Sequence, residues 1–173
     1  MAAPRLARSS SLDDLLLYRM SRLLAVAGSM VIRLCEGRFG ITRREWRVLA
    51  LLARHEGLLS SQLAERAQLD RARTSRAVTS LVAKKLVRRE TGRADRRQAQ
   101  LALTPQGHAL YEALFPLVRD LNRELLAALP AEGTAQLEAA LDALQSRADA
   151  MVQRADLPKA DRRRGGRLRP PMG

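Results

Sequence analysis

The stretch LAERAQLDRARTSRAVTSLVAKKLVRRETGRADRRQAQLALT, from Leu63 to Thr104, decides the fold. Its first seven residues carry small and apolar side chains at helical spacing, and Asp70 then stands where a short carboxylate can cap a second helix. That helix would bury one side and expose a polar, cationic side. The residues expected on the buried side are Thr74, Ala77, Val78 and Leu81. The pattern therefore predicts two helices joined by a tight turn.

A hairpin with an arginine-rich tip follows the second helix. Residues 86–90 suit one strand, and Ala99, Leu101 and Leu103 alternate with Gln98, Gln100 and Ala102, which predicts a second strand with one solvated face. Two strands with a cationic tip beside a helix-turn-helix make a winged helix, which places a helix in the major groove of DNA and an arginine in the minor groove. Charge runs are more often solvated surfaces. The order of cap, helix and arginine hairpin nevertheless favours DNA.

Three parts of this region supply side chains that can bond phosphate oxygens or base edges: the start of the first helix, the exposed side of the second, and the hairpin tip. Arg73 and Arg76 are expected to face the major groove. The predicted DNA-binding residues of these three parts are Ser60, Ser61, Gln62, Arg71, Arg73, Ser75, Arg76, Thr79, Ser80, Arg93, Arg96 and Arg97.

This region resembles the DNA-binding core of the MarR family of bacterial transcription regulators. The strongest mark is the wing Asp95-Arg96-Arg97 followed by Leu103-Thr104-Pro105-Gln106-Gly107. The resemblance extends from about Leu12 to about Ala155, and it implies that Asp95 also belongs to the DNA-binding set, orienting the wing by pairing with a nearby arginine. The further matches are Leu63-Ala64-Glu65-Arg66, Ser75-Arg76, Leu81 and Leu86-Val87.

Two residues depart from the family pattern. Gln68 stands where a turn glycine is common, and Lys85 replaces the glycine usual before Leu86-Val87. The family's hydroxyl cap would fall at Leu59, so Ser60 is expected to cap the first helix of the pair instead.

Outside this region the sequence predicts helices with well-marked ends. Ser11 and Thr42 are suited to cap the first and second helices, and Thr104 caps a long helix with Pro105 in its first turn. Pro130 separates that helix from a last one.

We therefore expect a mainly α fold with a two-stranded β wing, in one domain over residues 12–157. The winged-helix core occupies 42–104, and dimerisation helices occupy 12–36 and 105–157. Residues 1–11 are small, polar and basic, and residues 158–173 are rich in Gly, Pro and Arg, so both ends are expected to be disordered.

Composition supports a polyanionic partner. The 173 residues carry a net charge of +13, and residues 60–103 hold 11 basic and 4 acidic side chains, whereas residues 105–157 hold 4 basic and 8 acidic ones. A structured RNA is a weaker alternative to DNA, because RNA readers usually stack bases on aromatic side chains and the basic stretch contains none.

The sequence gives little support for catalysis, a cofactor or a metal site. The two histidines, His55 and His108, are far apart in the sequence, and the single cysteine excludes an internal disulfide and a multi-cysteine zinc site. Some MarR-like proteins sense oxidants through one cysteine near the start of the first helix. Cys35 lies near the end of its helix, so a structural role is favoured over a redox role.

The chain shows no apolar run of about 20 residues and no secretory signal pattern, so we expect a cytoplasmic protein without a membrane partner.

Three amphipathic helices, the first and the last two, lie at opposite ends of the sequence, and a winged helix alone cannot cover their apolar sides. They would bury one another across a two-fold axis to give a homodimer. The alternative is an intramolecular three-helix bundle. The resemblance implies the dimer, because MarR-like proteins dimerise through helices at both chain ends.

The resemblance also implies an effector, a small aromatic carboxylic acid such as a hydroxybenzoate, hydroxycinnamate or hydroxynicotinate, bound between the dimer helices and the winged helix. Such an anion needs a cation or hydroxyl among apolar walls. The candidates are Tyr18, Arg19 and Arg22 on the first helix, and Arg43, Trp46 and Arg47 on the second.

The expected function is that of a dimeric regulator, a repressor that leaves a pseudo-palindromic operator when the effector binds. The alternative is a constitutive or architectural DNA-binding protein without an effector.

Overall fold

The computed structural model of the chain describes residues 4–67, 69–90 and 99–156. The chain divides into two compact units, residues 1–127 and residues 128–173. None of the helices in the described ranges is long and apolar enough to cross a membrane.

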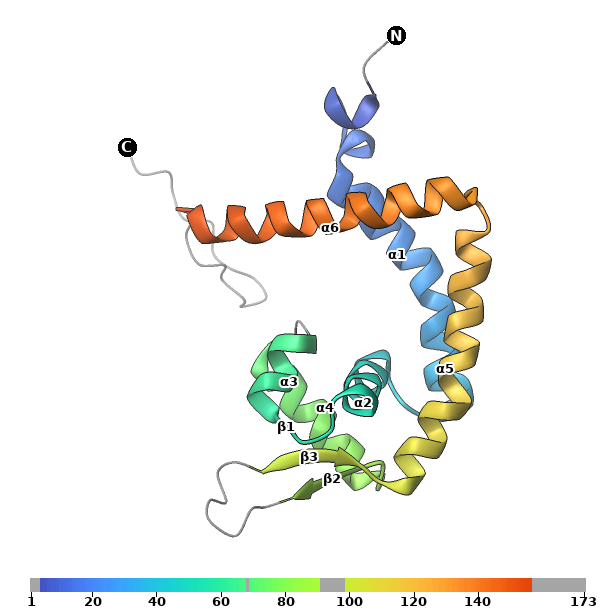
Figure 1. The fold of residues 1–173 in the computed structure, drawn as a ribbon, viewed down its shortest axis with the longest axis vertical. Coiled ribbons are helices and arrows are strands. Elements are labelled where there is room, and N and C mark those ends of the chain that lie inside the picture. The colour runs from blue at the N-terminus through green and yellow to red at the C-terminus, as the bar shows by residue number, and fades with distance from the viewer. Residues whose placement is uncertain (1–3, 68, 91–98, 157–173) are drawn as a thin grey trace. The chain divides into compact units, whose positions relative to one another are not determined.

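The first unit contains five helices and a small antiparallel sheet among its described residues (Figure 1). The helices are α1 (Leu16–Ile32), α2 (Arg43–Arg54), α3 (Ser60–Ala67), α4 (Arg71–Ala83) and α5 (Pro105–Leu126), and the strands are β1 (Leu58–Leu59), β2 (Val87–Glu90) and β3 (Gln100–Leu103). Short 3₁₀ turns at Arg5–Ala7 and Leu12–Asp14 precede α1, and one π-helical turn, Arg33–Arg38, follows it.

Local hydrogen bonds explain where α2 and α5 begin, and they confirm both predicted caps. The Glu45 N–H donates to Thr42 Oγ1 at 3.2 Å, and the Thr42 N–H donates back to Glu45 Oε2 at 2.5 Å. At α5 the Gly107 N–H donates to Thr104 Oγ1 at 3.0 Å, and Pro105 occupies the first turn, where its missing N–H costs nothing. Helix α5 also contains an interior proline, Pro116.

The sheet has three strands in the order β1-β3-β2, so the predicted two-stranded wing was one strand short. The extra strand is β1, in which Leu58 pairs with Leu101 and Leu59 with Gln100. Ala102, expected on the solvated face of β3, is buried. It lies opposite Arg88 on β2, whose long side chain shares that face.

The core of the first unit lies between α2, α4, the sheet and the start of α5, and it is built mainly from leucine and valine. Each such side chain contributes roughly 1.5–3 kcal/mol when it is fully buried. The leucines and valines with less than 2% exposure are Leu49, Leu52, Leu63, Leu81, Leu101, Leu103, Leu114, Val48, Val78 and Val87.

The segment 103–107 leads from β3 into α5, and it packs on the turn that follows α4. The Thr104 hydroxyl donates to Lys85 O at 2.7 Å, and the Thr104 N–H donates to Leu86 O at 3.1 Å. Gly107 passes so close to this turn that a Cβ built on it would overlap Leu86 O. Glycine is therefore required at position 107 by the approach of the two backbones.

Helix α4 ends in a turn that normally calls for glycine. Lys85 has a φ of +59°, in the left-handed region. The Leu86 N–H donates to Leu81 O at 2.9 Å and the Lys85 N–H to Val82 O at 3.0 Å, the two bonds of a Schellman motif. The geometry of a glycine turn is thus kept with a lysine in it.

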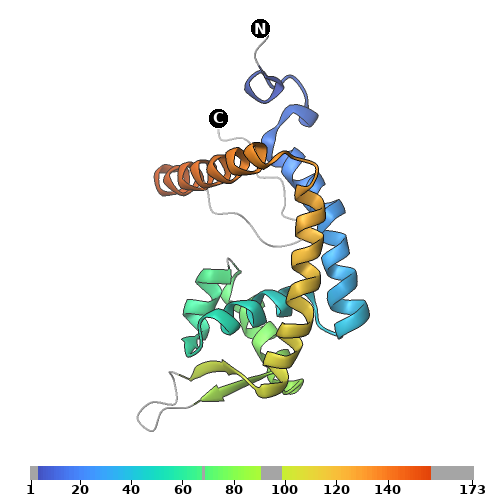
Figure 2. The same ribbon diagram turned by 45° about the vertical axis from the view of Figure 1, so that its right-hand side comes forward.

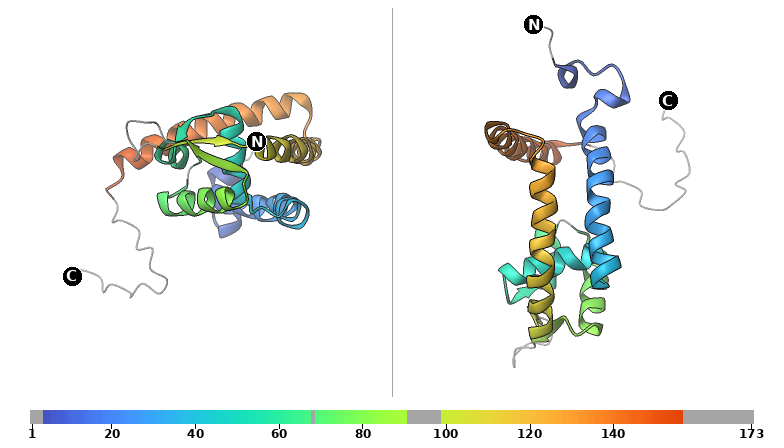
Figure 3. Two further views of the ribbon diagram at one scale, coloured as in Figure 1. Left: turned by 90° about the horizontal axis from the view of Figure 1, so that it is seen from below. Right: turned by 90° about the vertical axis from the view of Figure 1, so that its right-hand side faces the viewer.

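Helix α1 runs beside α5 (Figures 2 and 3). The prediction that Ser11 caps this helix was wrong, because the chain turns extended at Leu15 and α1 begins only at Leu16. Ser11 belongs to the preceding 3₁₀ turn, where its N–H and hydroxyl donate to Asp14 Oδ2 at 3.2 and 2.9 Å.

The N-terminal segment contains a short turn among its described residues. Arg5 forms a short 3₁₀ turn with Leu6 and Ala7, and its Nη2 lies 2.7 Å from Asp14 Oδ1. Hydrogen bonds from Ser11 and Ser10, together with the Arg5 guanidinium, hold the pKa of the Asp14 carboxyl well below its usual range.

The second unit contains helix α6 (Ala131–Arg154), which begins after Pro130. None of its 24 residues is buried. Its apolar side chains are exposed at helical spacing: Leu137, Leu141, Leu144 and Met151.

Candidate nucleic-acid interface and ligand cleft

Helix α4 presents the side chains that the sequence assigns to DNA. The Arg73 N–H donates to Asp70 Oδ1 at 2.8 Å, which confirms Asp70 as the cap. Thr74, Ala77, Val78 and Leu81 are buried, as predicted. The opposite side is exposed and carries Arg71, Arg73, Ser75, Arg76 and Thr79.

Two arginines of α4 are held against the first turns of the helix. Arg73 Nε lies 3.0 Å from Asp70 Oδ2, and Arg76 Nε donates to Ala72 O at 3.3 Å. Both side chains stay exposed, so their remaining guanidinium N–H groups can bond a base edge or a phosphate.

At the start of α3 the structure corrects the predicted cap. Helix α3 begins at Ser60, so the capping position is Leu59, and Gln62 Oε1 accepts the Leu59 N–H at 3.0 Å. The Gln62 side-chain carbonyl therefore serves the helix end, which leaves its amide N–H₂ for a partner. Ser60 and Ser61 are exposed.

Ser80 differs from the other predicted DNA-binding residues of α4. It is half-buried and its side chain bonds to Glu45, a buried carboxylate at the start of α2. Lys84 Nζ reaches the same carboxylate, at 3.0 Å from each oxygen, and also donates to Gly40 O at 2.8 Å. This cluster fixes α4 against α2, and Ser80 belongs to that contact.

The electrostatics of the cluster favour an ionised carboxylate. Burial alone would raise the pKa of Glu45, but hydrogen bonds from Ser80, Thr42 and Lys84 outweigh burial and lower it.

The predicted wing residues Arg93, Asp95, Arg96 and Arg97, and the departure at Gln68, lie outside the described residues.

A cleft of about 440 Å³ lies between α1, α2 and α5. Trp46, Tyr111 and Phe115 form one wall, with ring centroids 5.8 Å apart for Trp46–Tyr111 and 5.3 Å for Tyr111–Phe115. The other lining residues are Leu24, Gly28, Val31, Arg43, Arg47, Ala50, Leu51 and Arg54. Aromatic walls with a few cations suit a small aromatic anion, and the volume falls within the range of small-molecule sites.

The arginines of this cleft differ in what they bond. Arg47 Nη1 donates to Ala67 O at 3.0 Å, which ties it to the end of α3. Arg43 and Arg54 make no hydrogen bond or ion pair within the part of the chain that the structure describes. A Cβ on Gly28 would lie 3.0 Å from Arg43 Nη1, so the glycine lets that guanidinium approach α1.

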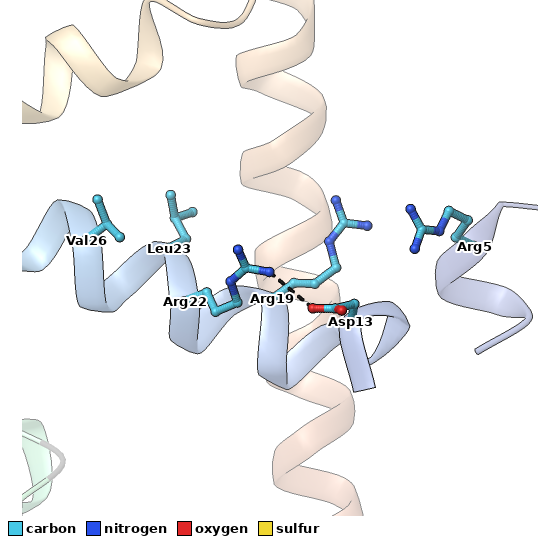
Figure 4. A pocket seen from close by; sticks show the side chains of 6 residues that line it. All are labelled: Arg5, Asp13, Arg19, Arg22, Leu23 and Val26. Carbon is cyan, nitrogen blue, oxygen red and sulfur yellow. Dashed lines mark hydrogen bonds and ion pairs between the residues drawn. The ribbon is translucent and has the colours of Figure 1, made fainter. Parts of the chain in front are cut away.

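Two of the remaining predicted effector residues line a separate hollow of about 600 Å³ at α1 (Figure 4). Arg19 and Arg22 line it with Arg5, and Arg22 Nη1 lies 3.1 Å from Asp13 Oδ1. The Arg22 guanidinium carbon is 5.9 Å from the centroid of the Tyr18 ring. Five of the six predicted residues are therefore divided between two sites, and Tyr18 is not among the lining residues of either.

Sequence reasoning missed the α5 and Arg54 contributions to the cleft. Tyr111 and Phe115 are four residues apart on α5, so they share a helix face, and that spacing was the available signal.

Cys35 is fully buried in the core, and burial raises the pKa of its thiol, in line with a structural role. No group of His, Cys, Asp and Glu suited to a metal ion occurs in the described part of the chain.

Residues 39–98 match the model of the MarR family. A MarR family transcriptional regulator from Silicibacter pomeroyi is 25% identical, with a TM-score of 0.66 over 85% of this chain and 94% of that chain. No curated protein matches significantly.

Two structures from Staphylococcus aureus share the fold. One is a MepR–DNA complex, 24% identical, with a TM-score of 0.72 over 77% of this chain and 98% of that chain. The other is MarR in complex with salicylate and kanamycin, 19% identical, with a TM-score of 0.62 over 81% and 89%.

Proposed function

We propose that the chain is a MarR-family DNA-binding transcription regulator, which acts as a dimeric repressor released by a small aromatic carboxylic acid. Its winged helix matches the model of that family, and its fold is similar to that of a MarR family transcriptional regulator. The observation that carries the proposal is the pairing of two sites in one unit. An exposed cationic side of α4 faces solvent, and an arginine-lined aromatic cleft lies behind α2.

The DNA-reading part of the proposal rests on α4. Its N-terminal half is fixed by the Asp70 cap and its buried side is seated in the core, so the exposed arginines have a defined position. We expect the helix to enter the major groove, with Arg73 and Arg76 at base edges and Arg71, Ser60, Ser61 and the wing at phosphates. A MepR–DNA complex is among the structures with this fold.

Dimerisation is proposed from the apolar surface that the chain leaves exposed. On α1, Leu17 and Val26 are 79% and 74% exposed, and α6 buries none of its residues. A lone amphipathic helix is marginal in water, so these faces require a partner. Two copies would place two α4 helices on half-sites about one helical turn apart, roughly 34–36 Å, which implies a pseudo-palindromic operator.

The effector is proposed to bind the cleft between α1, α2 and α5. Its ring would stack on Trp46, Tyr111 or Phe115, and its carboxylate would pair with Arg43 or Arg54, since neither guanidinium makes a hydrogen bond or an ion pair among the described residues. A hydroxybenzoate, hydroxycinnamate or hydroxynicotinate has the size and charge for this site. Salicylate is named with a MarR structure that shares the fold.

Release from DNA would follow from differential affinity. The cleft is walled by α2, part of the winged helix, and by α1 and α5, which run beside each other outside it. A ligand that fits one separation of these elements better than the other shifts the population toward that state. A coupling free energy of about 1–3 kcal/mol gives a 5- to 150-fold change in DNA affinity.

The DNA test uses the duplex just upstream of the protein's own reading frame, since regulators often control their neighbours. Arg73→Ala or Arg76→Ala should cost about 1–3 kcal/mol in binding and relax the choice of sequence. Arg119→Ala, an exposed α5 arginine, is the matched control and should bind like the wild type. Equal affinity of the wild type for duplex RNA, or unchanged binding by both α4 variants, would contradict the proposal.

The effector test titrates the three classes of aromatic acid into the protein–operator complex. Arg43→Gln and Arg54→Gln should abolish or weaken release while leaving operator affinity unchanged. Arg19→Gln and Arg22→Gln, which alter the other hollow, serve as controls and should release normally. Release that is lost only in the controls would move the site to α1. Absence of release by any acid would favour a constitutive or architectural DNA-binding protein.

A further inference from the structure

A third hollow, of about 340 Å³, lies on the winged helix where α3 begins beside α4 and the sheet. Its polar lining consists of the side chains of Ser60, Ser61 and Ser75 together with Arg89 of β2. Val78 and Leu101 provide a buried apolar floor. We call this hollow the serine–arginine groove.

The chemistry of the groove fits an oxyanion. Three hydroxyls can each donate one hydrogen bond, the guanidinium supplies a positive charge and several more donors, and no carboxylate occurs among the described residues that line it. The four side chains come from three separate elements, α3, α4 and β2. Their convergence is therefore a product of the tertiary fold.

The orientation of Arg89 ties the groove to the DNA-reading surface. Arg89 Nη2 donates to Thr79 Oγ1 at 3.5 Å, a long bond to the exposed side of α4. Its neighbour Arg88 is directed to the other face of the sheet, where its Nη1 donates to Leu103 O at 2.6 Å and its Nε to Glu90 Oε1 at 2.7 Å. Of these two adjacent arginines, only Arg89 is available to the groove.

We propose that the serine–arginine groove binds a backbone phosphate of duplex DNA, with Arg89 as its cation and Ser60, Ser61 and Ser75 as hydroxyl donors. This inference rests on the proposed DNA-binding function and adds to it a positioning residue outside the predicted α3, α4 and wing-tip set. A phosphate held here fixes the register of α4 in the major groove and carries no sequence information.

The test compares Arg89→Gln with Arg88→Gln, adjacent substitutions that remove the same charge on opposite faces of β2. Both proteins are first shown to be folded by circular dichroism and thermal unfolding. Dissociation constants for the operator and for an unrelated duplex are then measured between 50 and 200 mM salt. A Ser61→Ala, Ser75→Ala double variant, which keeps the charge, tests the hydroxyls.

We expect Arg89→Gln to weaken binding to both duplexes by about tenfold at the lower salt concentration, with the ratio between them unchanged. The slope of log K against log salt should fall by about 0.9 for each phosphate that the variant no longer neutralises, hence by about 1.8 for a dimer. Arg88→Gln should stay within about twofold of the wild type, since its guanidinium does not face the groove. The double variant should bind both duplexes more weakly, and by the same factor.

Equal effects of Arg88→Gln and Arg89→Gln would overturn the inference, because they would reflect net charge alone. A loss of affinity by Arg89→Gln on the operator but not on the unrelated duplex would also overturn it, since that result indicates a base contact. If the wild type binds DNA and Arg89→Gln binds it equally well, the phosphate site in the groove is excluded and the proposed function stands. If the wild type binds no duplex, both the phosphate site and the proposed DNA-binding function are excluded.

Discussion

At the scale of single residues, two backbone positions connect helix α4 to the rest of the winged helix. Gly107 lies against Leu86 O, and Lys85 holds a left-handed conformation that glycine adopts more readily. Both positions concern the same turn, between α4 and β2. Each supports a prediction that depends on backbone geometry alone.

Gly107→Ala should destabilise the chain strongly. The new methyl would overlap Leu86 O, so the start of α5 must move away from the turn and lose the Thr104 bonds, at a cost of about 3 kcal/mol or more. Chemical denaturation gives the free energy of unfolding. Gly37→Ala is the control, because nothing lies within 4 Å of its Cβ position, and it should change stability by less than about 1 kcal/mol. Similar values for the two would contradict this reading of the turn.

Lys85→Gly should stabilise the chain. A non-glycine residue in the left-handed region carries a cost of about 1–2 kcal/mol, part of which is offset by the greater freedom of glycine in the unfolded chain. A gain of about 1 kcal/mol relative to Lys85→Ala is expected, because alanine removes the same charge but keeps the Cβ. Thermal unfolding of the two variants side by side measures the difference. No gain over alanine would show that the lysine conformation is unstrained.

At the scale of elements, the cluster of Glu45, Lys84 and Ser80 joins α2 to α4. The pKa of Glu45 is lowered in the folded chain relative to the ordinary value of 4.5. Below that value the unfolded state binds more protons than the folded state, so stability rises with pH in this window. The contribution is fully present above about pH 4.5 and is lost as the pH falls through the folded pKa.

Unfolding measured from pH 7 to pH 3 should therefore show a loss of stability in acid that Glu45→Gln reduces. Lys84→Met should cost about 1.5–3 kcal/mol at neutral pH, because it removes the hydrogen bonds to a charged group that is only 3% exposed. Glu132→Gln, on exposed α6, is the control and should leave the pH profile unchanged. A Glu45→Gln profile identical to that of the wild type would exclude the cluster as the source.

The elements also show how far sequence reasoning reaches. Asp70, Thr42 and Thr104 were recognised as caps because a cap depends on a few consecutive residues, and the exceptional character of position 85 was visible for the same reason. Strand β1 was missed because two residues are too short to show a period. Tyr111 was missed as a cleft residue because its partner Trp46 lies 65 positions away, and only the packing of α5 on α2 brings them together.

At the scale of the whole molecule, the exposed apolar faces of α1 and α6 lead to a prediction about assembly. Light scattering should give about twice the chain mass of 19.2 kDa. Leu23→Glu should shift the protein toward monomer, because it places a charge on the exposed apolar side of α1. Ser29→Glu adds the same charge at an exposed polar position of that helix and should leave the dimer intact. A folded wild-type monomer at micromolar concentration would contradict the dimer.

Pro116 gives α5 an uneven bending stiffness. A proline inside a helix removes one backbone hydrogen bond, here the one that the Glu112 carbonyl would accept, and such positions are where helices kink. The weak point follows Phe115, a wall of the cleft, by one residue. The part of α5 that precedes Pro116 is about 16 Å long, so a bend of about 10° at this point displaces its far end by roughly 3 Å. A bend at Pro116, beside the cleft, would therefore move the start of α5, which contacts the turn that follows α4.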